Sequence, residues 1–397
     1  MAKRGGFFEN LFGSSDAQSQ NAFFNKGLKY LENGEEEKAI DYFERAIELD
    51  PYLSEAFNQL GFIYQKKGDL NLALEYFQKS LSIKSDNYWV YLHLGRIYYN
   101  KGEASKAIEF MQKSLYLKPD CYEANHALGL IYRFEGAHGK AIEYFLKALR
   151  LSSEDPSLYY SLGSSYYENG DHQKAIKNLK NAIGLKPDYW DAVFNLGVTY
   201  DKIDKQYLAI ENYKKAIKLK PDYKAFIYMG HIYVKKGLHD KAIECFQKAI
   251  DLEPGNHLAL YFLGYIYNKT EDHDKALVSF QKALDLKPDF HEALVSIGWN
   301  YLLQSNFEKA KDYFIQTCLK ASELKGTAIM NLGHVALLSD EKNRAMECFK
   351  ESLVLYKDKA EFFKGMENDF KDLKMESKGI TREEYDEILN KLKGVKE

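Results

Sequence analysis

The sequence predicts an all-α protein built as a solenoid of about ten helix-turn-helix repeats. Three observations support this prediction: a glycine recurs every 33 to 35 residues, a tyrosine usually follows it three positions later, and an alanine follows twelve positions later. A fixed period of this length is typical of stacked units, because one unit alone cannot bury its apolar face. The recurring glycines are Gly27, Gly61, Gly95, Gly129, Gly163, Gly197, Gly230, Gly264, Gly298 and Gly333.

The segment before the first repeat, residues 1–19, is expected to be a flexible leader. Its apolar stretch FFENLF, residues 7–12, contains a glutamate and an asparagine and is too short for the apolar region of a signal peptide. A second interpretation stays open, in which FFENLF is a short motif that docks on a partner or on the chain's own groove.

Each repeat within residues 20–357 is expected to contain two amphipathic helices. In the fifth repeat, Tyr159, Leu162 and Tyr166 are spaced as on one face of a helix, and a second such segment follows from Ala175. The turn between them, ENGD, contains a glycine that can adopt the left-handed conformation that ends a helix. In six repeats a proline 24 positions after the recurring glycine closes the second helix. The small glycine and alanine let the two helices approach closely.

Two spacings depart from the regular period. The interval from Gly197 to Gly230 is one residue short, and the interval from Gly298 to Gly333 is one residue long. We expect a local change of superhelical twist at each of these two junctions.

The C-terminal region, residues 358–397, is expected to cap the solenoid. Segment 360–374 is apolar on one face and charged on the other, as required of a helix that covers the last exposed edge. Gly379 is expected to end it. Thr381 and Glu384 form the pattern of a capping box for a final helix. That final helix is either a second cap or a helix that binds a partner or mediates self-association.

Composition excludes several classes of protein. The 397 residues include 55 Lys and Arg against 58 Asp and Glu, giving a net charge of -3, which argues against a dedicated nucleic-acid or anionic-membrane binder. No apolar run is long enough for a membrane span. Four cysteines without a CxxC pair fit a reducing compartment, so we expect a cytoplasmic protein without a disulfide framework.

Catalytic and metal-binding motifs are missing from the sequence. It contains no GxxxxGK[ST] phosphate loop, no GxSxG elbow and no HExxH pair. Histidine recurs nine positions after the repeat glycine in four repeats, but equivalent atoms of adjacent repeats lie roughly 10 Å apart, too far to share a metal. We therefore expect no enzyme activity, cofactor or metal. The four histidines are His138, His172, His239 and His273.

The recurring Leu-Gly, Tyr, Ala, Phe and Pro positions resemble the tetratricopeptide repeat (TPR) family. The resemblance covers about residues 20–357. It implies a right-handed α-α superhelix whose first helices line a concave groove that binds proteins. The RNA-binding pentatricopeptide repeat fits less well because it lacks the LG…Y spacing, and a generic helical bundle needs no fixed period.

The resemblance also implies which side chains face the groove: those three before, one after and four after the recurring glycine. They are more apolar and aromatic than a solvated surface requires, which is typical of an interaction surface. Alternatively, the apolar residues pack between repeats, and Arg96 and Arg133 are ordinary surface charges. The candidate binding residues are Arg96, Tyr99, His126, Arg133, Tyr160, Tyr167, Phe194, Tyr261, Tyr265 and Trp299. The last repeat contributes Met330, His334 and Leu337 to the same positions.

These observations predict a non-catalytic protein-protein interaction scaffold or adaptor that binds an extended peptide or a partner helix in the groove. The Lys and Asn pattern with which some family members hold a peptide carboxylate is incomplete here. The alternative is a regulatory or targeting subunit of an enzyme complex whose activity lies in another chain. Nucleic acid is not expected as a partner.

Overall fold

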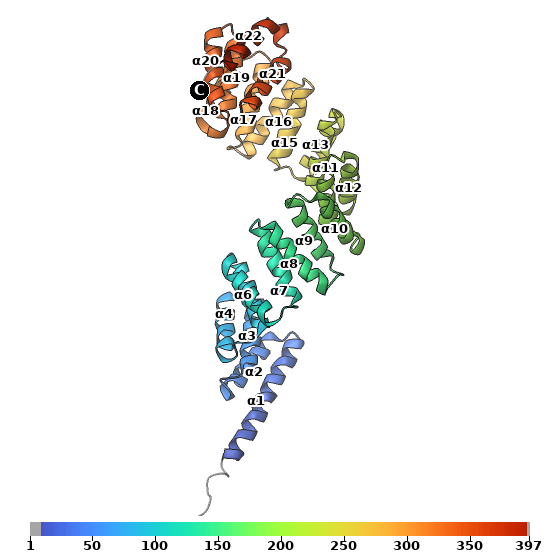
Figure 1. The fold of residues 1–397 in the computed structure, drawn as a ribbon, viewed down its shortest axis with the longest axis vertical. Helices are drawn as coiled ribbons and strands as arrows, with labels where there is room; N and C mark the ends of the chain where they lie inside the picture. Colours follow the sequence, from blue (N-terminus) through green and yellow to red (C-terminus); the bar gives the residue numbers. More distant parts are fainter. Residues whose placement is uncertain (1–8, 395–397) are drawn as a thin grey trace, which may run out of the picture. The chain divides into compact units, whose positions relative to one another are not determined.

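The computed structural model describes the backbone of residues 9–394 and the side chains of residues 21–394. Every regular element in this part of the chain is a helix, as predicted, and Figure 1 labels most of them. The chain divides into two units, Met1–Thr199 and Tyr200–Glu397, and each is described by itself. None of the helices in the described part is both long and apolar enough to traverse a bilayer.

Unit 1 consists of five helical pairs in its described residues. They are α1 (Glu9–Glu32) with α2 (Glu36–Leu49), α3 (Ser54–Lys67) with α4 (Leu70–Ile83), α5 (Tyr88–Asn100) with α6 (Ala104–Leu117), α7 (Tyr122–Phe134) with α8 (His138–Leu151), and α9 (Pro156–Glu168) with α10 (His172–Leu185). Helix α11 (Trp190–Lys202) crosses the boundary between the units.

Unit 2 continues the pattern and adds a different C-terminal region. Its helices are α12 (Gln206–Leu219), the pairs α13 (Tyr223–Lys235) with α14 (His239–Leu252), α15 (His257–Lys269) with α16 (His273–Leu286), α17 (His291–Leu303) with α18 (Phe307–Lys320), and α19 (Lys325–Leu338) with α20 (Lys342–Leu355), then α21 (Lys359–Asp372) and α22 (Arg382–Lys393). Two short 3₁₀ helices are η1 (Ser322–Leu324) and η2 (Met375–Lys378).

The recurring glycine sits where the two helices of a pair touch. A Cβ atom added to Gly61 would lie 2.7 Å from the ring of Phe77, and one added to Gly264 would lie 2.8 Å from the ring of Phe280. Both rings stand sixteen positions after their glycine and are buried. A side chain at the glycine position would therefore overlap the core, which explains why the position stays small.

A left-handed residue seven positions after the recurring glycine ends the first helix of each of these pairs. Glycine fills this position in six repeats, where the left-handed conformation costs little. Four later repeats place a residue with a side chain there, at a cost of about 1–2 kcal/mol for a Cβ atom in this conformation. The glycines are Gly34, Gly68, Gly102, Gly136, Gly170 and Gly237, and the other residues are Asp204, Glu271, Ser305 and Asp340.

First helices of neighbouring pairs approach one another in both units. Helix α5 contacts both α3 and α7, and α17 contacts both α15 and α19, whereas successive second helices are further apart. A stack whose first helices are closer together than its second helices curves toward the first helices. Within each unit the first helices therefore form the inner side, as the family resemblance implied.

The two irregular spacings fall where one pair is joined to the next, one in a linker and one at the start of a helix. The linker between α12 and α13 is residues 220–222, whereas regular linkers such as 84–87 have one residue more. The deletion is tolerated because a linker does not carry the packing between paired helices. The linker before α19, residues 321–324, has the regular length and contains η1 in place of the usual proline. The extra residue lies in α19 itself, which begins at Lys325, eight residues before Gly333, whereas α17 begins seven residues before Gly298.

Helix α1 begins at Glu9, before the boundary at residue 20 that the sequence led us to expect. Residues 9–19 are therefore helical, because a helix that has already formed extends at low cost through a polar segment without proline. The proposed docking motif FFENLF begins at residue 7, and its side chains lie outside the described residues.

Helices α21 and α22 cap the last repeat, as the amphipathic pattern predicted. Phe362, Met366 and Phe370 of α21 are buried in one core with the last two repeats. The capping box of Thr381 and Glu384 is present at the start of α22. Helix α21 ends at Asp372 instead of Gly379, because Lys374 adopts a left-handed conformation and η2 follows.

Candidate functional site

Helix α5 presents two predicted residues, Arg96 and Tyr99, on the inner side of unit 1. Arg96 is exposed and Tyr99 keeps 37% of its surface accessible. The neighbouring His93 is buried, and its Nδ1 lies 2.5 Å from Oε1 of Gln65 in the preceding repeat. Burial, and secondly the charge of Arg96, lower the pKa of His93 to about 4. Of these two neighbours, only Arg96 therefore carries a charge near neutral pH.

Helix α7 carries His126 and Arg133, which are both half-buried. The imidazole of His126 packs between Tyr122 and Phe145, with ring centroids 5.7 and 5.8 Å away. Burial is the main reason why the pKa of His126 is lowered. His126 therefore has the environment of a packed neutral histidine, and Arg133 provides the charge of this repeat.

Helix α9 carries Tyr160 and Tyr167, both half-buried. The hydroxyl of Tyr160 accepts a hydrogen bond of 3.3 Å from Nδ2 of Asn195, and its ring lies 5.2 Å from that of Tyr189. The ring of Tyr167 lies 5.5 Å from that of His172. Each tyrosine thus has packing partners and retains part of its surface.

Phe194 of α11 differs from the other candidates because only 8% of it is exposed. Its ring stacks on that of Trp190, with centroids 5.0 Å apart and planes at 7°. Because Phe194 stands three residues before the recurring glycine, we predicted that it faces the groove. The structure instead favours the packing alternative at this residue, because its neighbour on the same helix covers it.

Three other candidates, Tyr261, Tyr265 and Trp299, line one pocket of about 500 Å³ in unit 2. Tyr261 and Tyr265 come from α15 and Trp299 from α17, so two successive first helices supply the aromatic wall. The hydroxyl of Tyr261 accepts a hydrogen bond of 3.4 Å from Ser296, which fixes its ring. Tyr265 keeps 41% of its surface accessible. The sequence therefore identified residues that meet in space.

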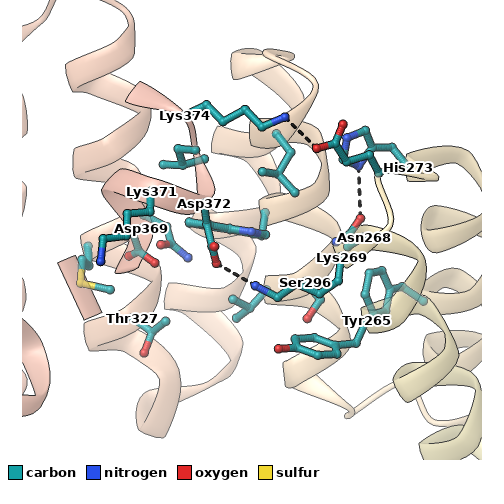
Figure 2. Close-up of a pocket in the computed structure, with 18 of the residues that line it drawn as sticks. Tyr265, Asn268, Lys269, His273, Ser296, Thr327, Asp369, Lys371, Asp372 and Lys374 are labelled. Atoms are coloured by element: carbon teal, nitrogen blue, oxygen red, sulfur yellow. Dashed lines mark hydrogen bonds and ion pairs between the residues drawn. The ribbon is translucent and has the colours of Figure 1, made fainter. Parts of the chain in front are cut away.

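The opposite wall of this pocket comes from α21 and η2, as Figure 2 shows for Asp369, Lys371, Asp372 and Lys374. Two ion pairs join the walls: Lys269 Nζ to Asp372 Oδ2 at 2.9 Å, and Lys374 Nζ to Glu271 Oε1 at 2.7 Å (Figure 2). Lys378 Nζ donates to the backbone oxygens of Leu302 and Leu303 at 3.4 and 3.3 Å. The C-terminal segment thus reaches back past the last repeat to α15 and α17.

The inner side of the last repeat is covered, which corrects the expectation that it is accessible. Met330 is 5% exposed, Leu337 1% and His334 0%. The apolar faces of α21 and α22 pack on these positions, because the last repeat has no successor to bury them. The pocket beside α21 is an accessible part of the inner side in unit 2.

A series of buried polar groups connects α19 to the two capping helices, α21 and α22. Tyr385 donates a hydrogen bond of 2.8 Å to the backbone oxygen of Met366, and Nε2 of His334 lies 3.4 Å from the Tyr385 hydroxyl. Nδ1 of His334 lies 3.8 Å from Oδ2 of Asp369. Burial lowers the pKa of His334 to about 3. Burial, and secondly the charge of Asp372, raise the pKa of Asp369 to about 7. Near neutral pH His334 is therefore uncharged, and Asp369 is only partly ionised.

The residues that sequence reasoning missed are those of the C-terminal wall, Asp369, Lys371, Asp372, Lys374 and Lys378. Their segment was recognised as a cap from its apolar face. Its polar edge carries no repeat signal, so the pattern could not show which helices that edge would face.

Metal and thiol chemistry receives no support from the described residues. No cluster of three or more His, Cys, Asp or Glu side chains in this part of the chain could hold a metal ion. The four recurring histidines each begin a second helix, from α8 to α16, and so occupy equivalent positions in separate pairs. The cysteines are free, and burial raises the pKa of Cys245 to about 11, which keeps it a thiol.

The stacked helical pairs define a helical-repeat protein. Tetratricopeptide repeat models match residues 21–53, 52–120, 191–223, 223–256 and 257–290, and a TPR repeat model matches residues 129–170 and 163–204. Because these matches cover more than half of the sequence, the chain belongs to the tetratricopeptide repeat family.

Several solved structures are similar to parts of the chain. A crystal structure of MamA is 35% identical over 41% of this chain and 95% of that chain, with a TM-score of 0.40. MamA from Desulfovibrio magneticus RS-1 is 25% identical over 43% and 96%, with a TM-score of 0.40. Pseudomonas aeruginosa pilF is 22% identical over 52% and 94%, with a TM-score of 0.46. No curated protein sequence matches the chain.

Proposed function

We propose that the chain is a non-catalytic scaffold or adaptor that binds an extended peptide or a partner helix on the inner side of its first helices. Family membership supports a role in protein interaction. The observation that carries the finer proposal is Tyr99, which keeps 37% of its surface accessible next to the exposed Arg96. An accessible tyrosine beside an arginine is the composition of interface hot spots.

The mechanism is binding to a preformed surface. The paired helices are held by fully buried rings such as Phe77 and Phe145, so the inner side does not have to be ordered on binding. A partner segment would pay the ordering cost and gain many small contacts along successive first helices. The four free cysteines in the described part support a location in the reducing cytoplasm.

Affinity capture with mass spectrometry tests this proposal. The bait pair is the wild-type chain and an Arg96→Glu, Tyr99→Ala variant, and we expect the variant to lose partners that the wild type recovers. The matched control is Tyr116→Ala on α6, because Tyr116 is 87% exposed on a second helix. Equal recovery by all three baits would reject the inner side of unit 1 as the binding surface.

The alternative proposal, a regulatory or targeting subunit of an enzyme complex, uses the same surface. It predicts that the wild-type bait recovers one enzyme in stoichiometric amount. Recovery of several proteins that share one linear motif favours the adaptor instead.

A further inference from the structure

The pocket between α15, α17 and α21 has features that the repeat itself does not require. It is a partly open space of about 500 Å³, which lies in the range of pockets that hold a ligand group. One wall is aromatic, from Tyr261, Tyr265 and Trp299, and the other wall belongs to the C-terminal segment. The pocket exists because α21 turns an open inner side into a space with two walls.

The charges around the pocket do not balance. Four lysines line it, Lys269, Lys371, Lys374 and Lys378, and two of them are neutralised by the ion pairs with Asp372 and Glu271. Among the described residues, Lys371 and Lys378 have no carboxylate within ion-pair distance. The remaining acid of the pocket is Asp369, whose pKa burial raises to about 7, so it is only partly ionised near neutral pH. The pocket therefore carries an excess of positive charge.

Lys378 is the better placed of the two unpaired lysines. It is half-buried, and its ammonium group is held by the last carbonyl groups of α17. Burial, and secondly the charge of Lys374, lower the pKa of Lys378. An ammonium donates three hydrogen bonds, so it can keep its contacts to α17 and still bind an anion.

We propose that this pocket binds an acidic side chain, Asp or Glu, that stands next to a large apolar side chain in an extended segment of a partner protein. The carboxylate pairs with Lys378, and the apolar side chain packs on Tyr261 and Trp299. This proposal rests on the proposed function, because the pocket belongs to the inner side of the first helices. It adds the chemistry of the partner.

Blocked dipeptides test the pocket without a natural partner. The probes are N-acetyl-Glu-Phe-amide, its Gln and Lys analogues, and N-acetyl-Gln-Phe with a free carboxyl terminus. Binding of each to the full chain is measured by saturation-transfer NMR. One charge-assisted hydrogen bond corresponds to about a tenfold difference, so the Glu probe should bind about tenfold more tightly than the Gln amide. The Lys probe should bind most weakly.

Variants of the chain assign the effect to named residues. Lys378→Gln should make the Glu and Gln amides bind alike, and Lys378→Arg should restore the preference. Trp299→Ala should weaken both probes equally. Lys180→Gln, at an exposed position of α10, is the matched control and should change nothing. Circular dichroism of each variant confirms that it is folded.

Three outcomes would overturn the proposal. Equal binding of the Glu, Gln and Lys probes would remove the charge selectivity. Tightest binding of the Lys probe would show that Asp369 dominates the pocket. Tightest binding of the probe with a free carboxyl terminus would show that the pocket selects chain ends. None of these results affects the capture experiment on unit 1, so failure here and failure of the proposed function are distinguishable.

Discussion

The inner sides of the two units differ although the same repeat builds both. In unit 1 the inner position Tyr99 is 37% exposed, whereas in unit 2 the corresponding Leu337 is 1% exposed, because α21 and α22 pack on it. The difference comes from the segment that follows the last repeat. Accessibility of a repeat position is thus decided by what lies next to the repeat, and the repeat sequence alone does not encode it.

Removal of the buried Phe362 side chain of α21 should have the largest effect on the difference between the two units. Phe362 is fully buried, with its ring 5.4 Å from that of Tyr356. We expect Phe362→Ala to destabilise unit 2 by about 3–5 kcal/mol through the lost burial and the cavity. Unit 1 should keep its stability, because solenoid repeats contact only their neighbours. Hydrogen exchange resolved along the chain measures both units in one experiment.

The matched control for this substitution is Phe134→Ala, because Phe134 is 79% exposed at the end of α7. It should leave the protection of both units unchanged. Equal loss of protection in both units of the Phe362→Ala variant would contradict the independent behaviour that we assign to unit 1.

The second prediction concerns pH and unit 2. The pKa of Asp369 is raised from 3.8 to about 7 in the folded protein, so the folded state keeps a proton that the unfolded state releases. Stability therefore falls as the pH rises through the interval between these values. From about pH 6 to pH 8 the wild type should lose about 1 kcal/mol relative to Asp369→Asn.

Urea unfolding of both proteins across this pH range measures the difference. His334, whose pKa is lowered to about 3 by burial, opposes the trend, because its neutral folded form is favoured as the pH rises. It is present in both proteins, so the comparison isolates the carboxyl group of Asp369. Parallel pH profiles for wild type and Asp369→Asn would show that Asp369 is not held protonated.

The smallest expected effect comes from the turns. Unit 1 has glycine at the left-handed position, for example Gly170 at φ 83°, whereas unit 2 has Ser305 at φ 58°. Ser305→Gly should stabilise unit 2 by about 0.5–1 kcal/mol, because relief of the strained conformation exceeds the entropy that glycine loses. Gly170→Ala should destabilise unit 1 by a similar amount. Thermal unfolding of the two variants shows whether each substitution raises or lowers stability. A change in the same direction for both variants would contradict a preference for glycine at this left-handed position.

Most of the fold could be predicted because it repeats. The same glycine and alanine positions recur from repeat to repeat, so Gly61 against Phe77 and Gly264 against Phe280 follow one rule. The candidate site was only partly predictable. Tyr265 and Trp299 were found from their positions, but the burial of Phe194 depends on its neighbour Trp190. The wall formed by Asp372 and Lys378 lies outside the repeat, where no periodicity guides the interpretation.

The constant sequence interval between the recurring glycine and the large side chain that it contacts has a consequence for how such a chain can change length. The interval is sixteen residues from Gly27 to Phe43 and again from Gly333 to Phe349, whereas the linkers vary. A whole hairpin excised or duplicated between two linkers preserves every such pair. A single codon gained inside a hairpin turns one helix face by about 100°. The unit that can be gained or lost without disturbing the packing is therefore one helical hairpin, from one linker to the next.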